Sequence, residues 1–201
     1  KVNTDNPSAT NGLVCDHCTA MPKPENDGKR YSRKIRTGVK FHDGTPLTAQ
    51  DVAATFQKIV DPKNGQGSAR KQYFEMVDKI TAPDDQTVVF DLKYASGAFM
   101  SAMANPFNYV YSKKKLDEDP RWYEKNILGS GPFKFKERQA GASMSGVRNE
   151  DFYVKGQPYH EGWEATFAPK QAVRVQAIRG DRAAIEFRGF PPKSRDDLKE
   201  A

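Results

Sequence analysis

Residues 31–52 read YSRKIRTGVKFHDGTPLTAQDV and combine, in order, an extended stretch, a sharp turn and the start of a helix. In the first part, Ile35, Val39 and Phe41 are apolar and are interspersed with lysine and arginine, a pattern typical of a strand with a buried side. The tripeptide at 42–44 is His-Asp-Gly, which favours a turn because Asp and Gly tolerate tight backbone bends. The stretch therefore predicts a strand, a turn and a helix in close succession.

The predicted helix begins at Thr48, whose hydroxyl can accept hydrogen bonds from the free amide groups of the first turn. Asp51 follows at the position where its carboxylate completes a capping box and where negative charge is favoured by the helix dipole. Proline at position 62 ends the helix, since the residue before proline avoids helical backbone angles. Helical spacing places four apolar side chains on one face: Val52, Phe56, Ile59 and Val60.

A β-hairpin is predicted after the helix. Residues 76–81 and 87–92 read as short strands, and Ala-Pro-Asp-Asp-Gln at 82–86 forms the turn between them. Apolar residues alternate along the second strand and give it an apolar face. We expect the helix to pack on this face, with four side chains buried: Val52, Phe56, Val88 and Phe90.

The later part of the chain predicts shorter elements by the same patterns. They are a short helix after Gly97, a strand at 110–111, a polar helix with Trp122 and Tyr123, strands from 133, at 162–167 and at 183–187, and a helix at 172–178. The break at Gly129–Pro132 predicts a domain boundary. The mixture of hairpins, helices and a late β–α–β order indicates the α/β class with mixed α+β character.

Composition and charge exclude several functions. The 201 residues carry a net charge of +6, but the charges alternate in sign, as where three lysines at 113–115 precede acidic residues at 117–119. No basic stripe with interleaved aromatic residues is present, so we expect no nucleic-acid binding. No apolar run approaches the roughly 20 residues that span a bilayer. The chain begins at Lys1 without methionine or an apolar signal segment, which we interpret as processing or excision from a longer chain.

No catalytic constellation is recognisable. The sequence contains no His-Glu-x-x-His pair, no Gly-x-Ser-x-Gly elbow and no phosphate loop, because Gly129-Ser130-Gly131 is too short and no Gly-Lys-Ser/Thr follows. We therefore predict that the protein is not an enzyme and needs no cofactor. His42 could act as a base, but in a His-Asp-Gly turn we expect it to make a local hydrogen bond that shapes the turn.

The two cysteines, Cys15 and Cys18, form a Cys-x-x-Cys motif. A redox motif of this kind normally opens a helix after a strand, and no strand pattern precedes it here. A structural zinc site needs four ligands, and His17 would be only the third. We expect no metal at these residues, which leaves two incidental thiols or a local disulfide.

The stretch at 27–52 resembles the signature of the oligopeptide-, dipeptide- and nickel-binding proteins that supply ABC importers. That family typically shows Tyr-x-apolar-x-apolar-Arg, then Lys-aromatic-polar-Asp/Asn-Gly-x-Pro-apolar-Thr-Ala-x-Asp-Val, and the spacing here fits throughout. Further landmarks follow in the family's order: Asp61-Pro62, Ala82-Pro83-Asp84, Leu128–Phe133, Gly162–Glu164, Phe167–Pro169 and Gly180-Asp181. The resemblance covers about residues 13–200.

The resemblance implies part of a type II periplasmic-binding-protein-like fold. It assigns 1–30 to an irregular start of the first lobe, 31–128 to an extra small α+β domain, and 129–201 to the return into the first lobe. Family members are more than twice as long, so we expect this chain to be a fragment without the second lobe. Ligands of this family are held between two lobes that close by a hinge.

The resemblance also implies a function. We expect a solute-binding component of an ABC importer, monomeric, which captures peptides or a similar small polar ligand in the periplasm or on the outer face of the cytoplasmic membrane and presents it to the importer subunits. The alternative is a stable fragment that acts only as a structural or protein-interaction module without ligand binding. A ligand titration discriminates between the two, since half a pocket forfeits most of the contact area that a small ligand needs.

Candidate ligand residues follow from the alignment with this family. Ser68 stands where peptide-binding relatives place a cleft-lining residue, and Asn105-Pro106 stands where they place a second. Both positions lie in predicted loops, which carry binding residues more often than regular elements do. For the hypothesis to hold, the loop after the helix and the segment that follows the hairpin must come together.

Two residues depart from the family pattern, Arg33 inside the decisive stretch and Arg30 just before it. Arg33 occupies a strand position where the family has an apolar residue, usually Phe, and Arg30 replaces a small or β-branched residue. An unpaired guanidinium is costly to bury, so this departure favours an exposed edge strand.

Overall fold

A computed structural model describes residues 1, 12–62, 67–187 and 189–199. It divides into two compact units. The first unit comprises Lys1–Lys134 and Arg148–Tyr159, and the second comprises Phe135–Val147 and His160–Ala201. The assignment of 1–30, 31–128 and 129–201 to parts of a larger two-lobed protein stays a prediction.

The first unit is built on a four-stranded antiparallel sheet with the order β1-β2-β4-β3. The strands are β1 (Pro24–Glu25), β2 (Arg30–Lys34), β3 (Val77–Thr81) and β4 (Thr87–Leu92). The hairpin predicted from alternation is therefore confirmed as β3 and β4. The predicted strand at 31–41 is shorter than expected, since β2 ends at Lys34. The predicted turn at 42–44 is confirmed, and an isolated bridge between Lys40 and Pro46 flanks it.

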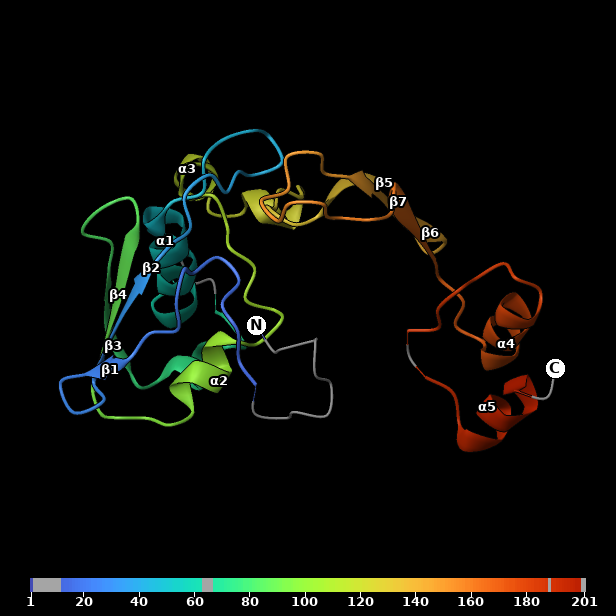
Figure 1. Cartoon of the computed structure of the whole chain (residues 1–201), viewed down its shortest axis with the longest axis horizontal. Helices are drawn as coiled ribbons and strands as arrows, with labels where there is room; N and C mark the ends of the chain where they lie inside the picture. The colour runs from blue at the N-terminus through green and yellow to red at the C-terminus, as the bar shows by residue number, and fades with distance from the viewer. Residues whose placement is uncertain (2–11, 63–66, 188, 200–201) are drawn as a thin grey trace. The chain divides into compact units, whose positions relative to one another are not determined.

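Helix α1 (Ala49–Val60) lies beside this sheet, as Figure 1 shows, and supplies the centre of the core. The four side chains expected to be buried are buried, with exposed fractions of 6% for Val52, 3% for Phe56 and 0% for both Val88 and Phe90. The Phe56 ring meets the rings of Phe74 and Phe90 edge-on, with centroid distances of 5.4 Å in each case. The predicted packing of helix on hairpin is confirmed.

The start of α1 matches the predicted capping box. Thr48 is the N-cap residue, and the Asp51 carboxylate accepts hydrogen bonds from the Thr48 backbone N–H at 2.7 Å and from the Thr48 hydroxyl at 3.0 Å. The other carboxylate oxygen accepts the backbone N–H of Lys113 at 2.7 Å. Asp51 thus also joins α1 to α3 (Lys113–Glu118), a connection that local capping rules do not predict.

Short helical elements complete the first unit. They are the 3₁₀ turn η1 (Lys71–Phe74), α2 (Phe99–Met103), α3 and the 3₁₀ turn η2 (Trp122–Glu124). The helix predicted after Gly97 is confirmed as α2. The strand predicted at 110–111 is wrong, because this backbone pairs with a helix side chain and not with a strand. The Tyr111 N–H donates to the Thr55 hydroxyl of α1 at 2.8 Å.

The second unit contains most of a three-stranded sheet, in the order β5-β6-β7, and two helices. Their bounds are β5 (Phe133–Gln139), β6 (Ser143–Arg148), β7 (Gly162–Thr166), α4 (Gln171–Arg179) and α5 (Pro192–Lys199). The expected strands at 133 and 162 and the expected helix at 172–178 are confirmed, while β6 and α5 were not predicted.

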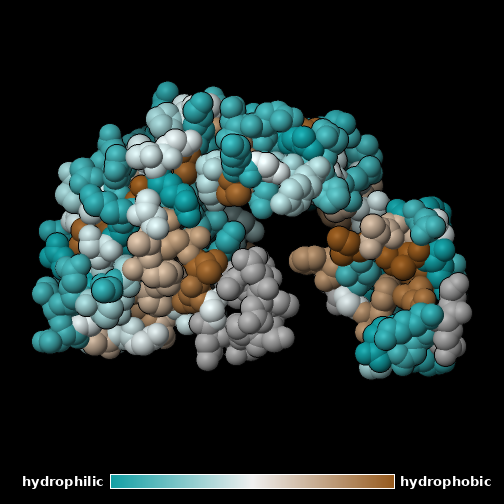
Figure 2. All heavy atoms as spheres, viewed as in Figure 1, coloured by the Kyte–Doolittle hydropathy of each residue, from teal (hydrophilic) through white to brown (hydrophobic). Residues whose placement is uncertain are grey.

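The strand predicted at 183–187 is wrong, and with it the late β–α–β order. This segment is irregular, and its apolar side chains Ile185 and Phe187 are 82% and 98% exposed. Figure 2 shows apolar side chains gathered on the surface around α4. A strand exists only where a neighbour accepts its backbone hydrogen bonds, and no described strand lies against this segment. Apolar alternation alone does not supply that neighbour.

The charge of Arg33 favoured an exposed edge strand, and the structure agrees with this expectation only in part. The Arg33 backbone pairs with Val88 of β4 alone, but its side chain turns inward. One guanidinium nitrogen, Nη2, donates to the Met100 sulfur at 3.1 Å, and Nε is buried with no hydrogen-bond partner among the described residues. Burial lowers the pKa of Arg33 to about 10. The group stays charged at neutral pH, so its incomplete pairing destabilises the fold.

We predict that Arg33→Met raises the free energy of unfolding by about 2 kcal/mol, because an unbranched apolar side chain removes the buried charge and keeps most of the packing. Urea denaturation measures the change. The matched control is Arg30→Met, since Arg30 is a surface residue whose Nη1 lies 3.6 Å from the Asp91 carboxylate. Its effect should stay within about 0.5 kcal/mol. A destabilised Arg33→Met variant contradicts the prediction.

Candidate functional site

The candidate ligand residues lie beyond the C-terminal end of α1 and beyond α2. Ser68 precedes η1, and its hydroxyl oxygen accepts the Arg70 backbone N–H at 3.2 Å. Asn105 follows α2, and its side-chain oxygen accepts the Phe107 backbone N–H at 2.9 Å in a turn around the exposed Pro106. Within the described part of the chain, the Ser68 hydroxyl hydrogen and the Asn105 amide nitrogen have no hydrogen-bond acceptor, so both can donate to a ligand.

Arg70 connects the two loops. Its Nη1 donates to the Phe107 carbonyl oxygen and to the Asn108 side-chain oxygen, the latter at 3.3 Å. Asn108 in turn donates to the Ala102 carbonyl at the end of α2, at 2.8 Å. The segments that contain Ser68 and Asn105 are therefore joined by one side chain, which is the geometric condition for a shared binding surface. Whether they bind a ligand stays a proposal.

Three exposed aromatic residues belong to these segments or follow them closely in the sequence. Tyr73 of η1, Phe107 and Tyr109 are 52%, 63% and 63% exposed. Nothing in the sequence marked these three residues, or Arg70, as candidate binding residues. The available signal was weak, because aromatic residues are normally assigned to the core and only the tertiary structure shows which of them stay outside.

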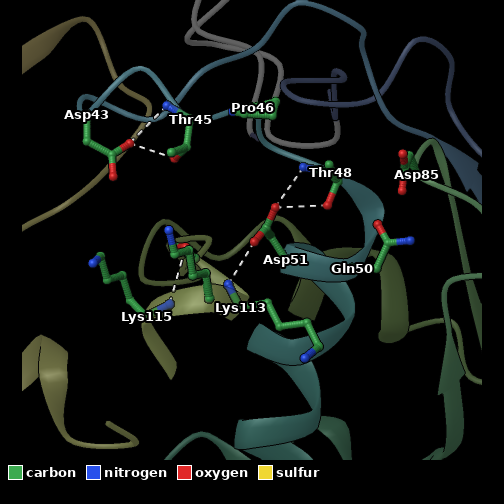
Figure 3. A pocket seen from close by; sticks show the side chains of 11 residues that line it. Asp43, Thr45, Pro46, Thr48, Gln50, Asp51, Asp85, Lys113 and Lys115 are labelled. Atoms are coloured by element: carbon green, nitrogen blue, oxygen red, sulfur yellow. Dashed lines mark hydrogen bonds between the residues drawn. The ribbon is translucent and has the colours of Figure 1, made fainter. Parts of the chain in front are cut away.

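A cavity of about 540 Å³ lies at the N-terminal end of α1, opposite to the end that precedes Ser68. Figure 3 shows it between the start of α1, the turn at 42–46 and the start of α3. Its lining includes Thr48, Gln50 and Asp51, and three lysines at 113–115 border it. Neither Ser68 nor Asn105 lines this cavity, so the cavity and the predicted ligand residues are separate features of the first unit.

Most of the charged and polar groups that line this cavity already have protein partners. Asp51 accepts its three hydrogen bonds as described, and Asp43 accepts the backbone N–H and the hydroxyl of Thr45 at 3.0 and 2.6 Å. Lys113 pairs with Asp117, and Lys115 pairs with Glu118 at 2.9 Å. We therefore interpret the lining as a structural network that fixes the start of α1 and not as a ligand site.

His42 does not make the local hydrogen bond expected for its turn. Its Nε2 lies 3.0 Å from the carbonyl oxygen of Gly131, 89 residues away, and its backbone N–H donates to Gly129 at 2.8 Å. His17 lies against the same segment, with its Nε2 3.1 Å from the Ser130 hydroxyl. His17 and His42 thus both hydrogen-bond to the segment 129–132, where the sequence predicted a domain boundary. Burial lowers the pKa of both His17 and His42.

These histidines predict a loss of stability in mild acid. Because their pKa values are lower in the folded than in the unfolded chain, the unfolded chain binds more protons below about pH 6.5. The melting temperature should therefore fall as the pH decreases from about 7 to about 5. The slope of the melting temperature against pH should be smaller for His17→Gln than for the wild type. Equal slopes for wild type and His17→Gln contradict this assignment.

The cysteines form a disulfide, with a Cα–Cα distance of 5.1 Å between Cys15 and Cys18. This decides between the two possibilities that the sequence left open. Within the described ranges, no group of three or more His, Cys, Asp or Glu residues is arranged to hold a metal ion. The helices in those ranges are too short or too polar to cross a bilayer.

Comparison with known proteins gives consistent matches. The sequence model of the family described as "Bacterial extracellular solute-binding proteins, family 5 Middle" matches residues 14–200. The chain is 37% identical over 145 residues to the oligopeptide-binding protein AppA of Bacillus subtilis, which covers 68% of this chain and 26% of AppA. It is 31% identical over 164 residues to a probable D,D-dipeptide-binding periplasmic protein, DdpA, of Escherichia coli, covering 79% of this chain and 31% of DdpA.

Solved structures show the same similarity. The structure of Bacillus subtilis AppA in complex with a nonapeptide superimposes with a TM-score of 0.79 and 28% identity, over 92% of this chain and 37% of that structure. The relatives are binding proteins by their descriptions, and the chain spans about a quarter to two fifths of their length. The mixed α and β architecture of the first unit is thus the architecture of one part of such proteins.

Proposed function

Because the chain belongs to the bacterial extracellular solute-binding proteins of family 5, we propose that it forms part of the solute-binding component of an ABC importer. Its ligand is a peptide or a similar small polar molecule, captured outside the cytoplasmic membrane and passed to the importer subunits. The proposal rests on the match over 14–200 and on relatives described as peptide-binding. Monomeric action without nucleic acid and without catalysis belongs to the same proposal.

The observation that carries the binding role is the surface formed by the two loops that Arg70 joins. It combines hydrogen-bond donors from Ser68 and Asn105 with an exposed aromatic ring from Phe107. Peptide ligands offer backbone carbonyl groups and apolar side chains, which match this combination. The remaining contacts would come from the rest of a protein as long as its relatives, through hinge closure around the ligand.

The test is a calorimetric titration of di-, tri- and longer peptides into the purified protein in its natural full length. We expect Ser68→Trp combined with Asn105→Ala to weaken peptide binding at least tenfold, because a bulky ring fills the surface and one amide donor is lost. The melting temperature of the ligand-free form should change little, since both residues lie in loops outside the core cluster.

The matched control is Gln86→Trp combined with Asn126→Ala, two exposed positions. Gln86 lies in the turn whose Asp85 carbonyl accepts the N–H of Ala49 at 2.8 Å, so it is at the end of α1 opposite to Ser68. The control should bind peptides like the wild type. Unaltered affinity in the Ser68/Asn105 variant would remove this site and leave the family assignment intact.

A structural or protein-interaction module is the second candidate. The exposed apolar side chains of the second unit favour it, because no apolar side chain is buried among the described residues of 135–147 and 160–199. Such a surface also suits a segment that packs on further protein of the same binding component. If no class of peptide released heat on titration or raised the melting temperature, the interaction module would be favoured over the importer component.

A further inference from the structure

The loop closed by the Cys15–Cys18 disulfide is a feature that the proposed function does not use. The bond spans a sequence separation of only 3, and the chain contains no other cysteine. A cross-link over so short a loop restricts the unfolded chain less than one over a long loop. Its main effect is therefore local, on the backbone and orientation of the two residues that it encloses, Asp16 and His17.

Both enclosed residues hold segments that are remote in sequence. The Asp16 carboxylate accepts the Tyr153 hydroxyl at 2.7 Å, across 137 residues. The His17 Nε2 lies 3.1 Å from the Ser130 hydroxyl, across 113 residues, and the His17 and Tyr153 rings lie 5.6 Å apart. The loop is itself held on the end of β2, because Arg36 donates from its backbone N–H to the His17 carbonyl and from Nε to the Asp16 carbonyl, each at 2.7 Å.

The two sulfur-bearing residues differ in exposure. Cys18 is 8% exposed and forms an isolated bridge with Ile35, whereas Cys15 is only partly buried. The Cys15 sulfur lies 3.7 Å from the sulfur of Met21, a side chain that is 43% exposed. An incoming thiolate therefore reaches Cys15 before Cys18, and access is one of the factors that decide which sulfur is attacked.

We propose that the Cys15–Cys18 disulfide is a thiol-exchange site, whose opening releases the segments around Ser130 and Tyr153 from the loop that it closes. The ligand class is a small thiol or a protein dithiol. With the bond intact, Asp16 and His17 are held toward their partners. With the bond open, the loop gains backbone freedom, and both hydrogen bonds lose the constraint that aligns them.

The chemistry is a two-electron exchange. A thiolate attacks the Cys15 sulfur, the Cys15–Cys18 bond breaks, and the Cys18 thiolate leaves and takes up a proton. A second thiol attacks the mixed disulfide and releases Cys15, which is protonated in turn. The protein disulfide is reduced to two thiols, and two thiols of the reductant are oxidised to one disulfide.

The first test treats the folded 201-residue chain with reduced glutathione without denaturant, and maps the products by peptide mass spectrometry. We expect a glutathione adduct on Cys15 and not on Cys18. A disulfide that reacts only after the protein is unfolded by urea overturns the proposal, as does an adduct confined to Cys18.

The second test compares hydrogen exchange of the oxidised chain with that of the chain reduced by a phosphine. Peptides that cover 14–18, 129–131 and 149–153 should exchange at least tenfold faster after reduction, while α1 at 49–60 should keep its protection. Cys15→Ser combined with Cys18→Ser should reproduce the reduced pattern, and the reduced wild type serves alone if that variant does not fold. Unchanged exchange at 149–153 after reduction contradicts the proposal.

A matched variant distinguishes an effect of the disulfide that acts through the Asp16–Tyr153 hydrogen bond from a general increase in backbone mobility. Tyr153→Phe removes the hydrogen bond to Asp16 and keeps the disulfide and the ring contact. Exchange at 149–153 should already be faster in oxidised Tyr153→Phe, and reduction should then add less than it adds in the wild type. An equal increment in both proteins shows that the disulfide does not act through Asp16, and it overturns the coupling.

Discussion

Replacing Phe56 with alanine should lower the free energy of unfolding by about 3–5 kcal/mol. Phe56 is 3% exposed at the centre of the contact between α1 and the sheet, with the rings of Phe74 and Phe90 edge-on to it. The substitution removes the buried ring and the edge-to-face contacts, and the surrounding strands cannot close the space completely. The loss should be a large fraction of the stability of a domain of this size.

Urea denaturation monitored by circular dichroism measures this loss, provided that the slope of the free energy of unfolding against urea concentration is the same in both proteins. Tyr94→Ala is the matched control, because it also removes an aromatic ring, from a side chain that is 53% exposed. Its effect should stay within about 1 kcal/mol. A loss below about 1 kcal/mol for Phe56→Ala would show that the helix does not pack on the hairpin as described.

Replacing Asp51 with alanine should cost about 3 kcal/mol, more than any other single change at the start of α1. Its carboxylate is largely buried and accepts hydrogen bonds from the Thr48 N–H, the Thr48 hydroxyl and the Lys113 N–H. Alanine leaves two backbone N–H groups of two different helix starts without their acceptor. Hydrogen bonds to a charged acceptor are stronger than neutral ones, so the loss exceeds that of an ordinary cap.

Two comparison variants separate the contribution of the Asp51 carboxylate from that of the Thr48 hydroxyl and from that of an exposed carboxylate. Thr48→Ala keeps the carboxylate and should cost only about 1 kcal/mol. Asp78→Ala removes an exposed carboxylate from β3 and should change the free energy of unfolding by about 0.5 kcal/mol or less. Equal losses for Asp51→Ala and Thr48→Ala in urea denaturation would mean that the bonds from the Thr48 N–H and the Lys113 N–H to Asp51 contribute nothing to stability.

The local parts of the fold were predictable because their causes lie within a few residues. Thr48 and Asp51 are neighbours on one helical turn, and Pro62 ends that helix by steric exclusion of the preceding residue. The hairpin follows from alternation on either side of a five-residue turn at 82–86. The same patterns also predicted the buried faces that carry Phe56 and Phe90, but not the burial of Val89 on the other side of β4.

The wrong predictions concern backbone whose partner lies far along the chain or is not a strand. Residues 110–111 have strand-like side chains, but Thr55 of α1 takes their hydrogen bond. Residues 183–187 also alternate, and no described strand lies beside them. Side-chain patterns report preferred backbone angles, whereas a strand also requires a neighbour at hydrogen-bond distance.

For the candidate site, the resemblance supplied Ser68, Asn105 and Pro106, and the tertiary structure showed what joins them. Arg70 is an ordinary surface arginine in the sequence, and only the fold places its guanidinium on the Phe107 carbonyl. The exposure of Phe107 likewise depends on which surfaces pack against it. The sequence indicates which loops carry the candidate residues, but not that these loops lie together in the fold.

The sequence by itself determined the family, the cap and length of α1, the hairpin and the helix face that enters the core, because each follows from short-range sterics and periodicity or from a long ordered motif. Only the tertiary structure decided that Arg33 turns inward, that His42 reaches Gly131, and that the loop between Cys15 and Cys18 holds Ser130 and Tyr153. These outcomes depend on contacts across 67 to 137 residues. Such contacts form only when the whole core closes, so no local pattern encodes them.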